Sequence, residues 1–360
     1  MSSEVLFSSV AFDRYDPNVT LPSKFSRMLD ALELEPLVKG KTVAIKMHLG
    51  RNIGYSTIHP IYVKRLVDKL KACEPEMLYI TDQEVAGACD RGYSQEHLGV
   101  PVVDACGATD RYLYPKDMDF HSFRNLDVAG HIHDADVMID LSHVKGHGAC
   151  GYGGAVKNIA MGCVSGRTRH QLHGLEGGVV WDEDLCSQCG QCVISCNHKA
   201  NSLRDGKYKI FYHNCTFCQH CVKVCPTGAL TMSDNQYERF QTGMARATQG
   251  VLNGFQPGHV LYINFLTHIT VICDCWGFTT APIVPDIGIA ASRDIVAVER
   301  ACLDMIKAEN VLPSGLMEGT ELSGRGHLLE QIHGKNPYIQ LEKLADLGCG
   351  TQEYHLTEIK

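Results

Sequence analysis

The residues VMIDLSHVKGHGACGYGGAVKNIAMGC, at positions 137–163, join a short apolar run directly to a glycine-rich loop. The run VMIDLSHV is short and apolar enough to predict a buried strand. Five glycines follow between Gly146 and Gly154, and glycine permits positive φ angles and close approach of the backbone to a ligand. Because open α/β sheets bind ligands beyond the carboxyl ends of their strands, we expect a site at this loop.

Strand–helix alternation continues on both sides of this loop. Expected strands lie at residues 42–48, 77–82 and 259–266, and expected helices at 60–73, 236–255 and 294–308. Such alternation predicts an α/β fold: an open, mostly parallel sheet with helices on both faces. Neither flank alone supplies many strands, so we expect residues 1–180 and 235–360 to build one split α/β domain. Two independent domains are the alternative.

Between these flanks lie eight of the seventeen cysteines, in two matching strings. CSQCGQCVISC (186–196) and CTFCQHCVKVC (215–225) begin 29 positions apart and share the spacing C-x2-C-x2-C-x3-C. This spacing holds [4Fe-4S] clusters: three cysteines on a tight loop ligate one cubane, and the fourth ligates the other. Zinc ribbons and disulfides are the alternatives, but zinc sites usually pair two C-x2-C knuckles.

The expected cofactors are therefore two [4Fe-4S] clusters, held by residues 181–234 as a small α+β ferredoxin-like domain inserted into the larger one. The expected ligands are Cys186, Cys189, Cys192 and Cys225 for cluster one, and Cys215, Cys218, Cys221 and Cys196 for cluster two.

The bulk properties exclude several classes of protein. A formal net charge of −8 argues against nucleic acid, whose binding needs clustered Lys and Arg. No apolar run reaches the roughly 18 residues of a membrane span, and the first residues lack the pattern of a secretory signal. Cubane strings and an odd number of cysteines indicate a reducing compartment. We expect a cytoplasmic protein of an anaerobic cell.

The glycine-rich loop carries the candidate catalytic residues. His143, Lys145, His147 and Lys157 combine proton-transferring and anion-binding side chains around the glycine turn. The alternative is a surface loop with solvated charges, which rarely gathers such residues so densely. The loop matches neither a P-loop nor G-x-G-x-x-G, so nucleotide binding is not indicated.

A second concentration is VICDCWGF, residues 271–278. If this segment is a strand, Cys273 and Cys275 lie on one face of it. With Cys163 they are candidate ligands of a third metal site or metallocofactor, which His147 or His268 would complete. The alternative is that these cysteines are small buried hydrophobic residues.

A third concentration, Lys46 and His48, ends an early strand. A salt bridge and a hydrogen-bonded histidine are the ordinary interpretation of such a pair. Its position at a strand end favours a functional role slightly.

These motifs, in this order, resemble the domain-of-unknown-function-362 family in the form that carries an inserted bacterial-type 2[4Fe-4S] ferredoxin domain. The strings that carry the resemblance are VAIKMHLG, the glycine-rich loop, the two cysteine strings, VICDCWGF, APIVPDIGIAAS and LADLGCGTQEYHL. The resemblance implies iron–sulfur binding and the split α/β arrangement, and implies no particular reaction. GGAVKNIAMG also resembles the glycine–lysine loop of the lactate racemase family, in which a lysine tethers a nickel pincer cofactor.

Three functions remain open. The first is an oxidoreductase in which the two clusters take electrons from a redox partner protein and pass them to a small molecule in the α/β domain. The second is an electron carrier whose α/β domain only docks a partner. The third is a factor that reduces or assembles a metallocofactor. A carrier needs no Lys/His/Cys constellation at strand ends, so the sequence favours the first.

Overall fold

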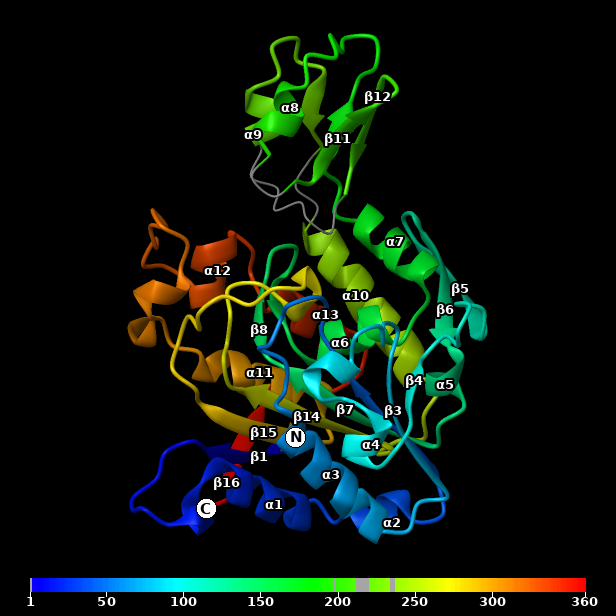
Figure 1. Cartoon of the computed structure of the whole chain (residues 1–360), viewed down its shortest axis with the longest axis vertical. Coiled ribbons are helices and arrows are strands. Elements are labelled where there is room, and N and C mark those ends of the chain that lie inside the picture. The colour runs from blue at the N-terminus through cyan, green and yellow to red at the C-terminus, as the bar shows by residue number, and fades with distance from the viewer. Residues whose placement is uncertain (1, 197–198, 212–219, 234–236) are drawn as a thin grey trace.

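The computed structural model describes residues 2–196, 199–211, 220–233 and 237–360. Its centre is an eight-stranded sheet in the order β16-β1-β15-β14-β7-β2-β3-β4 (Figure 1). These strands are β1 (Ser3–Ser9), β2 (Thr42–Met47), β3 (Met77–Asp82), β4 (Val102–Asp104), β7 (Val137–His143), β14 (Val260–Leu266), β15 (Gly288–Ser292) and β16 (Tyr354–Glu358). All neighbouring pairs are parallel except the two that involve β15. The predicted open, mostly parallel sheet is confirmed.

The central strands are apolar because both faces of the sheet are covered. In β7, Val137, Ile139 and Leu141 join the hydrophobic cluster on one face, and Met138 joins the cluster on the other. Helices α1 (Leu21–Ala31), α2 (Leu34–Val38), α3 (Pro60–Ala72) and α4 (Gln95–Leu98) cover the first face. Helices α6 (Ala155–Gly162), α10 (Tyr237–Leu252), α11 (Ile295–Met305) and α13 (Ile339–Asp346) cover the second (Figure 1).

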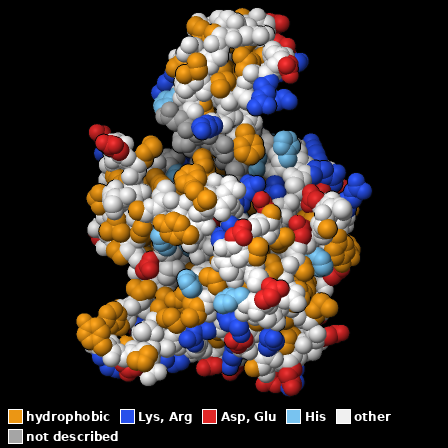
Figure 2. Space-filling model, viewed as in Figure 1, with side chains coloured by type: hydrophobic (Ala, Val, Ile, Leu, Met, Phe, Trp, Pro, Cys, Tyr) orange, Lys and Arg blue, Asp and Glu red, His pale blue; other side chains and the backbone are white. Residues whose placement is uncertain are grey.

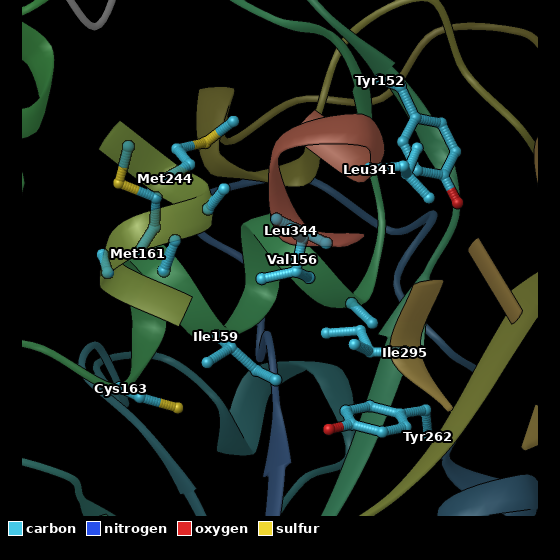
Figure 3. Close-up of a cluster of buried hydrophobic side chains, with 14 of the residues drawn as sticks. Tyr152, Val156, Ile159, Met161, Cys163, Met244, Tyr262, Ile295, Leu341 and Leu344 are labelled. Carbon is cyan, nitrogen blue, oxygen red and sulfur yellow. The ribbon is translucent and has the colours of Figure 1, made fainter. Parts of the chain in front are cut away.

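Helix α6 follows the glycine-rich loop and is buried in the second hydrophobic cluster. Figure 3 shows Val156 and Ile159 of α6 among Ile295 of α11, Leu344 of α13 and other buried side chains. Burial of such aliphatic side chains stabilises the fold by about 1.5–3 kcal/mol each. This packing therefore fixes the position of α6, the helix that carries Lys157 and Asn158.

The large region has further, mostly short elements besides these strands and helices. They are β5 (Leu113–Phe120), β6 (Phe123–Ala129), α5 (Gly130–His133), β8 (Lys145–His147), β9 (Gly151–Gly153), α7 (Gly166–Gly174) and α12 (Leu328–His333), with short 3-10 helices at Pro17–Val19, Cys89–Arg91, Asp274–Trp276, Ala308–Asn310 and Pro313–Gly315. The strand considered for residues 271–278 was wrong, because Asp274–Trp276 is a 3-10 helix. Among the described helices, none has the length and apolar character needed to cross a membrane.

The described residues between 179 and 233 form a small module apart from the large sheet (Figure 1). Its described elements are β10 (Val179–Trp181), α8 (Gln191–Ile194), β11 (Asn201–Arg204), β12 (Lys207–Ile210), α9 (His220–Lys223) and β13 (Leu230–Met232). β10 pairs with β13 and β11 with β12, both antiparallel. Strands from before and after this module share the large sheet. The domain boundaries at residues 181 and 234 stay a prediction.

Candidate functional site

A cavity of about 490 Å³ lies at the carboxyl ends of β2, β3 and β7. Its lining includes His48, Asp82, His143, Lys145, Lys157 and Arg169, and the small module contributes Ile210 and Phe211. Figure 2 shows Lys, Arg and His side chains gathered on the body of the molecule beneath the small module. Polar groups from three neighbouring strand ends therefore converge on one hollow, as is typical of ligand sites in open α/β sheets.

Asp274 is the centre of one charged network in the cavity wall. Its Oδ2 accepts hydrogen bonds from Lys145 Nζ at 2.5 Å and His143 Nδ1 at 2.8 Å, and its Oδ1 accepts from Ser56 Oγ at 2.8 Å. Burial opposes ionisation of this carboxyl, but Lys145 and His143 outweigh it and hold the pKa of Asp274 well below its usual value. Two of the four candidate catalytic residues are thus engaged with one buried carboxylate.

Asp82, at the end of β3, is the centre of a second network. Its Oδ1 lies 3.1 Å from Lys46 Nζ, and its Oδ2 lies 2.9 Å from His48 Nδ1. Lys46 also donates to Asn158 Oδ1 at 2.6 Å. The pKa of Asp82 is lowered: burial acts to raise it, but Lys46 and His48 outweigh burial. The expected salt bridge of Lys46 and hydrogen bond of His48 are both present.

Only one of the two ring nitrogens of His48 has a hydrogen-bond partner among the described residues. Nδ1 faces the Asp82 carboxylate, and Nε2 is buried without a hydrogen-bond partner among the described residues. Burial lowers the pKa of His48, which favours the neutral ring with its proton on Nδ1. A carboxylate that orients an imidazole in this way leaves Nε2 as an acceptor or metal ligand, on a residue that lines the cavity.

Asn158 of α6 connects Lys46 of β2 with Asp140 of β7. Its Nδ2 donates to Asp140 Oδ1 at 2.9 Å, and Asp140 Oδ2 accepts from Ser142 Oγ at 2.7 Å. Burial raises the pKa of Asp140 to about 7. A charged residue in the middle of an apolar strand needs such partners, since an unpaired buried carboxylate is costly.

Lys157 differs from the other two lysines of the site. Its amine lines the cavity without an ion pair or hydrogen bond among the described residues, whereas Lys46 and Lys145 are paired. Burial and the nearby Lys145 lower the pKa of Lys157 to about 8. Arg169 also lines the cavity without an ion pair in the described part of the chain. Two cations therefore remain for an anionic ligand.

Glu299 of α11 anchors the start of α6. One of its carboxylate oxygens accepts from the backbone N–H of Ala155 at 2.6 Å and from Asn264 Nδ2 at 2.8 Å. At Gly154 an added Cβ would lie 2.2 Å from this oxygen, so the close approach requires glycine there. Burial raises the pKa of Glu299 to about 7.

The cysteine pair meets a histidine instead of the third predicted cysteine. One ring nitrogen of His147 and the Sγ atoms of Cys273 and Cys275 all lie within 4.8 Å of one another, and the two sulfurs form a disulfide. Cys163 is the C-cap of α6 and does not belong to this group. His268 Nε2 lies 3.1 Å from the carbonyl oxygen of Thr280 and is also outside it.

A family model described as domain of unknown function (DUF362) matches residues 43–304, more than half of the chain. The chain belongs to this family. Among solved structures, a Thermotoga maritima protein aligns at 13% identity over 71% of this chain and 52% of its own, with a TM-score of 0.39. The lactate racemase apoprotein of Thermoanaerobacterium thermosaccharolyticum aligns at 11% identity over 68% and 49%, with a TM-score of 0.34. The DUF362 chain thus spans about half the length of these structures. No curated protein matches it.

In this DUF362 protein the small module brings four of the predicted cluster ligands together. Cys186, Cys189, Cys192 and Cys225 line one pocket, with Tyr208 and Leu230 beside them. Burial acts to raise the pKa of Cys225, but hydrogen bonds from backbone N–H groups, that of Leu230 first, lower it.

The second predicted set is described only in part. Cys196 Sγ accepts from the backbone N–H of Ala200 at 3.2 Å, and Cys221 is buried. Cys215 and Cys218 lie outside the described residues.

Several residues of the DUF362 site carried no assigned role in the sequence. Asp82 and Asp140 are acidic residues at the end and in the middle of apolar strands, and that pattern is a readable signal. Asp274 stood out only as the residue between two cysteines. Glu299 lies on a helix remote in sequence from α6 and gives no signal, because its role depends on long-range packing.

Proposed function

We propose that this DUF362 protein is a low-potential iron–sulfur oxidoreductase that reduces a small anionic molecule in the 490 Å³ cavity. Two [4Fe-4S] clusters in the small module would receive electrons from a redox partner protein and pass them to the cavity. The observation that carries the proposal is the pocket shared by Cys186, Cys189, Cys192 and Cys225. A cytoplasmic, reducing location is part of this proposal.

The shared pocket supports crossed ligation. The first three cysteines belong to one string and Cys225 closes the other, which is the pairing expected of a two-cluster ferredoxin. Hydrogen bonds from backbone N–H groups lower the pKa of Cys225, and the thiolate is the form that binds iron. Burial raises the pKa of Cys192, so iron would have to displace its thiol proton on binding. The shared pocket of four cysteines still suits a cubane.

Contact between module and cavity supports electron delivery. Ile210 and Phe211 belong to the same module as the cluster pocket and line the cavity. A carrier that only docks a partner would not need the buried networks of Asp82 and Asp274. The metallocofactor-assembly alternative is favoured only by the group of His147, Cys273 and Cys275.

The cavity residues suit proton-coupled reduction of an anion. Lys157 and Arg169 supply positive charge for an anionic group. The pKa of Lys157, about 8, is close to neutral pH, where a general acid donates a proton most effectively. His48 Nε2 can accept a hydrogen bond from a substrate hydroxyl. Two electrons from the clusters and two protons from the site and solvent would reduce one polar double bond.

Iron and sulfide analysis of anaerobically prepared protein tests the proposal. About eight iron atoms per chain are expected, and Cys225→Ala should lose about half of them with its EPR change confined to one cluster. Cys349→Ala, outside the module, is the matched control and should retain all of the iron. Protein without cubane iron, or an unchanged Cys225→Ala variant, would contradict the proposal. Lys157→Met should keep the iron and lose reductive turnover.

A further inference from the structure

We propose that His147, Cys273 and Cys275 bind one thiolate-preferring divalent transition-metal ion at the cavity wall, with a fourth coordination position open to the cavity. The role of this ion as a substrate-binding centre rests on the proposed reductase function. The binding of the ion does not rest on it.

The spacing of the three ligands fits a single ion. Zinc–thiolate bonds of about 2.3 Å and zinc–imidazole bonds of about 2.0–2.1 Å place two ligands of a tetrahedral ion roughly 3.6–3.8 Å apart. The ligand atoms of this group all lie within 4.8 Å of one another. Two thiolates and an imidazole also select for soft or borderline ions such as Zn²⁺, Co²⁺, Ni²⁺ and Fe²⁺. Once the disulfide between the two sulfurs is reduced, side-chain rotations of Cys273 and Cys275 would bring them to this spacing.

The two segments that carry the ligands are joined by buried contacts. Lys145, two residues before His147, pairs with Asp274, which lies between the two cysteines. Gly146 N donates to the carbonyl oxygen of Thr270 at 2.8 Å, which ties β8 to the segment leading to Cys273. These contacts do not involve the ligand atoms, so the site is organised before any ion binds.

Cys150 supports the histidine from behind. Its Sγ lies 3.2 Å from His147 Nδ1 and donates its own S–H to the carbonyl oxygen of Tyr152 at 3.0 Å. His147 Nδ1 also accepts a hydrogen bond from the backbone N–H of Ala149 at 3.2 Å, so Ala149 and Cys150 together hold the ring in one orientation. Ligating histidines are commonly oriented by such a partner.

The site has an open side. His147 and Cys273 are buried, whereas Cys275 is half-buried and lines the cavity. Three protein ligands with one solvent-facing position are typical of catalytic rather than structural zinc sites. A substrate that replaces the fourth ligand would lie in the cavity that Lys157 also lines.

Reduction of the disulfide must precede metal binding. Two electrons convert the Cys273–Cys275 disulfide into two thiols. A dithiol reductant supplies these electrons and the two protons as it closes to its own cyclic disulfide. The incoming ion then displaces two thiol protons. The site is consequently loaded only in reduced protein.

Zinc binding to the full-length chain tests this inference. Anaerobic protein reduced with a dithiol, incubated with Zn²⁺ and gel-filtered should hold one zinc more than the Cys275→Ser variant in elemental analysis. His147→Ala should show the same loss, and Cys89→Ala, an exposed cysteine, should bind as the natural chain does. Circular dichroism checks that each variant is folded.

The outcomes separate the two proposals. If reduced natural chain and Cys275→Ser bind equal amounts of zinc, the site does not exist. If the difference of one zinc is seen but cubane iron is absent, the proposed reductase fails and the metal site stands. If cubane iron is present but the two chains bind equal amounts of zinc, the metal site fails and the proposed reductase stands. Protein that was never reduced should show no difference between the two chains.

Discussion

At the residue scale, Asp274 holds together the wall of the cavity. Asp274→Ala leaves the buried Lys145 ammonium without a counter-charge and His143 Nδ1 without its hydrogen-bond partner. Losing one partner of a buried pair costs about 3–5 kcal/mol. Urea unfolding should show this loss. Asp346→Ala is the matched control: it removes an exposed pair with Lys343 at 3.6 Å, worth about 0–1 kcal/mol. Equal losses in the two variants would mean that the network contributes nothing beyond a surface pair.

Glu299 gives a residue-scale prediction about pH. Its folded pKa, about 7, lies above the ordinary 4.5, so the folded state holds more protons than the unfolded state between these values. Its contribution to stability is therefore complete below pH 4.5 and is lost as pH rises toward 7. Glu299→Gln should flatten this part of the profile of thermal midpoint against pH.

Other buried groups also titrate in that window. The pKa of Asp140 is also raised to about 7, so Asp140→Asn should remove a further part of the slope. The lowered pKa values of Asp82 and Asp274 act at more acidic pH. The lowered pKa values of His48, His327 and His333 act in the opposite direction, because there the unfolded state holds more protons than the folded state. The comparison with the natural chain is therefore decisive: a Glu299→Gln profile with the same slope as the natural chain between pH 4.5 and 7 would contradict the prediction.

At the element scale, β8 depends on a close approach at one glycine. A Cβ at Gly146 would lie 2.3 Å from the carbonyl oxygen of Val271, which is backbone and cannot rotate away. Gly146→Ala should destabilise the protein by about 1–3 kcal/mol and weaken zinc binding by moving His147. Gly148→Ala adds its methyl group to open space and should change stability by less than about 0.5 kcal/mol. Similar unfolding curves for the two variants would show that the β8 contact tolerates displacement.

The elements that could be predicted are those whose cause is local. The expected helix at 294–308 is α11, because Asp294 accepts from the backbone N–H groups of Val296 and Ala297 and caps it. The strand considered at 271–278 was wrong for a long-range reason. Asp274 is drawn into the interior by Lys145 and His143, which come from another strand end. The spacing of the two cysteines carries no information about that pairing.

At the scale of the whole molecule, the large sheet and its helices could be predicted, but the composition of the site could not. Strand ends identified His143, Lys145 and Lys157 as residues of one region, and the structure brings all three to the cavity. That His147 rather than Cys163 meets the cysteine pair depends on the β8–β9 hairpin. The inserted ferredoxin domain, its clusters and its boundaries stay predictions.

The small module can be removed at its two ends, which lie next to each other. Val179 pairs with Met232, and Ser233 N donates to the carbonyl oxygen of Gly178 at 2.9 Å, so the two ends of the module lie side by side. The two hydrophobic clusters that flank the large sheet contain no described residue of 181–234. Replacing residues 180–231 by a short Gly/Ser linker should therefore leave a folded α/β protein without cluster iron, since closing a short loop costs little.

Circular dichroism, gel filtration and iron analysis of this shortened chain check the outcome. The zinc difference between the shortened chain and its Cys275→Ser form should persist, because His147, Cys273 and Cys275 all lie outside the module. Aggregation of the shortened chain would mean that the α/β region needs the module for folding, and retained cubane iron would place the clusters elsewhere. Loss of the zinc difference with the fold intact would instead tie the metal site to the module side of the cavity, where Ile210 and Phe211 lie.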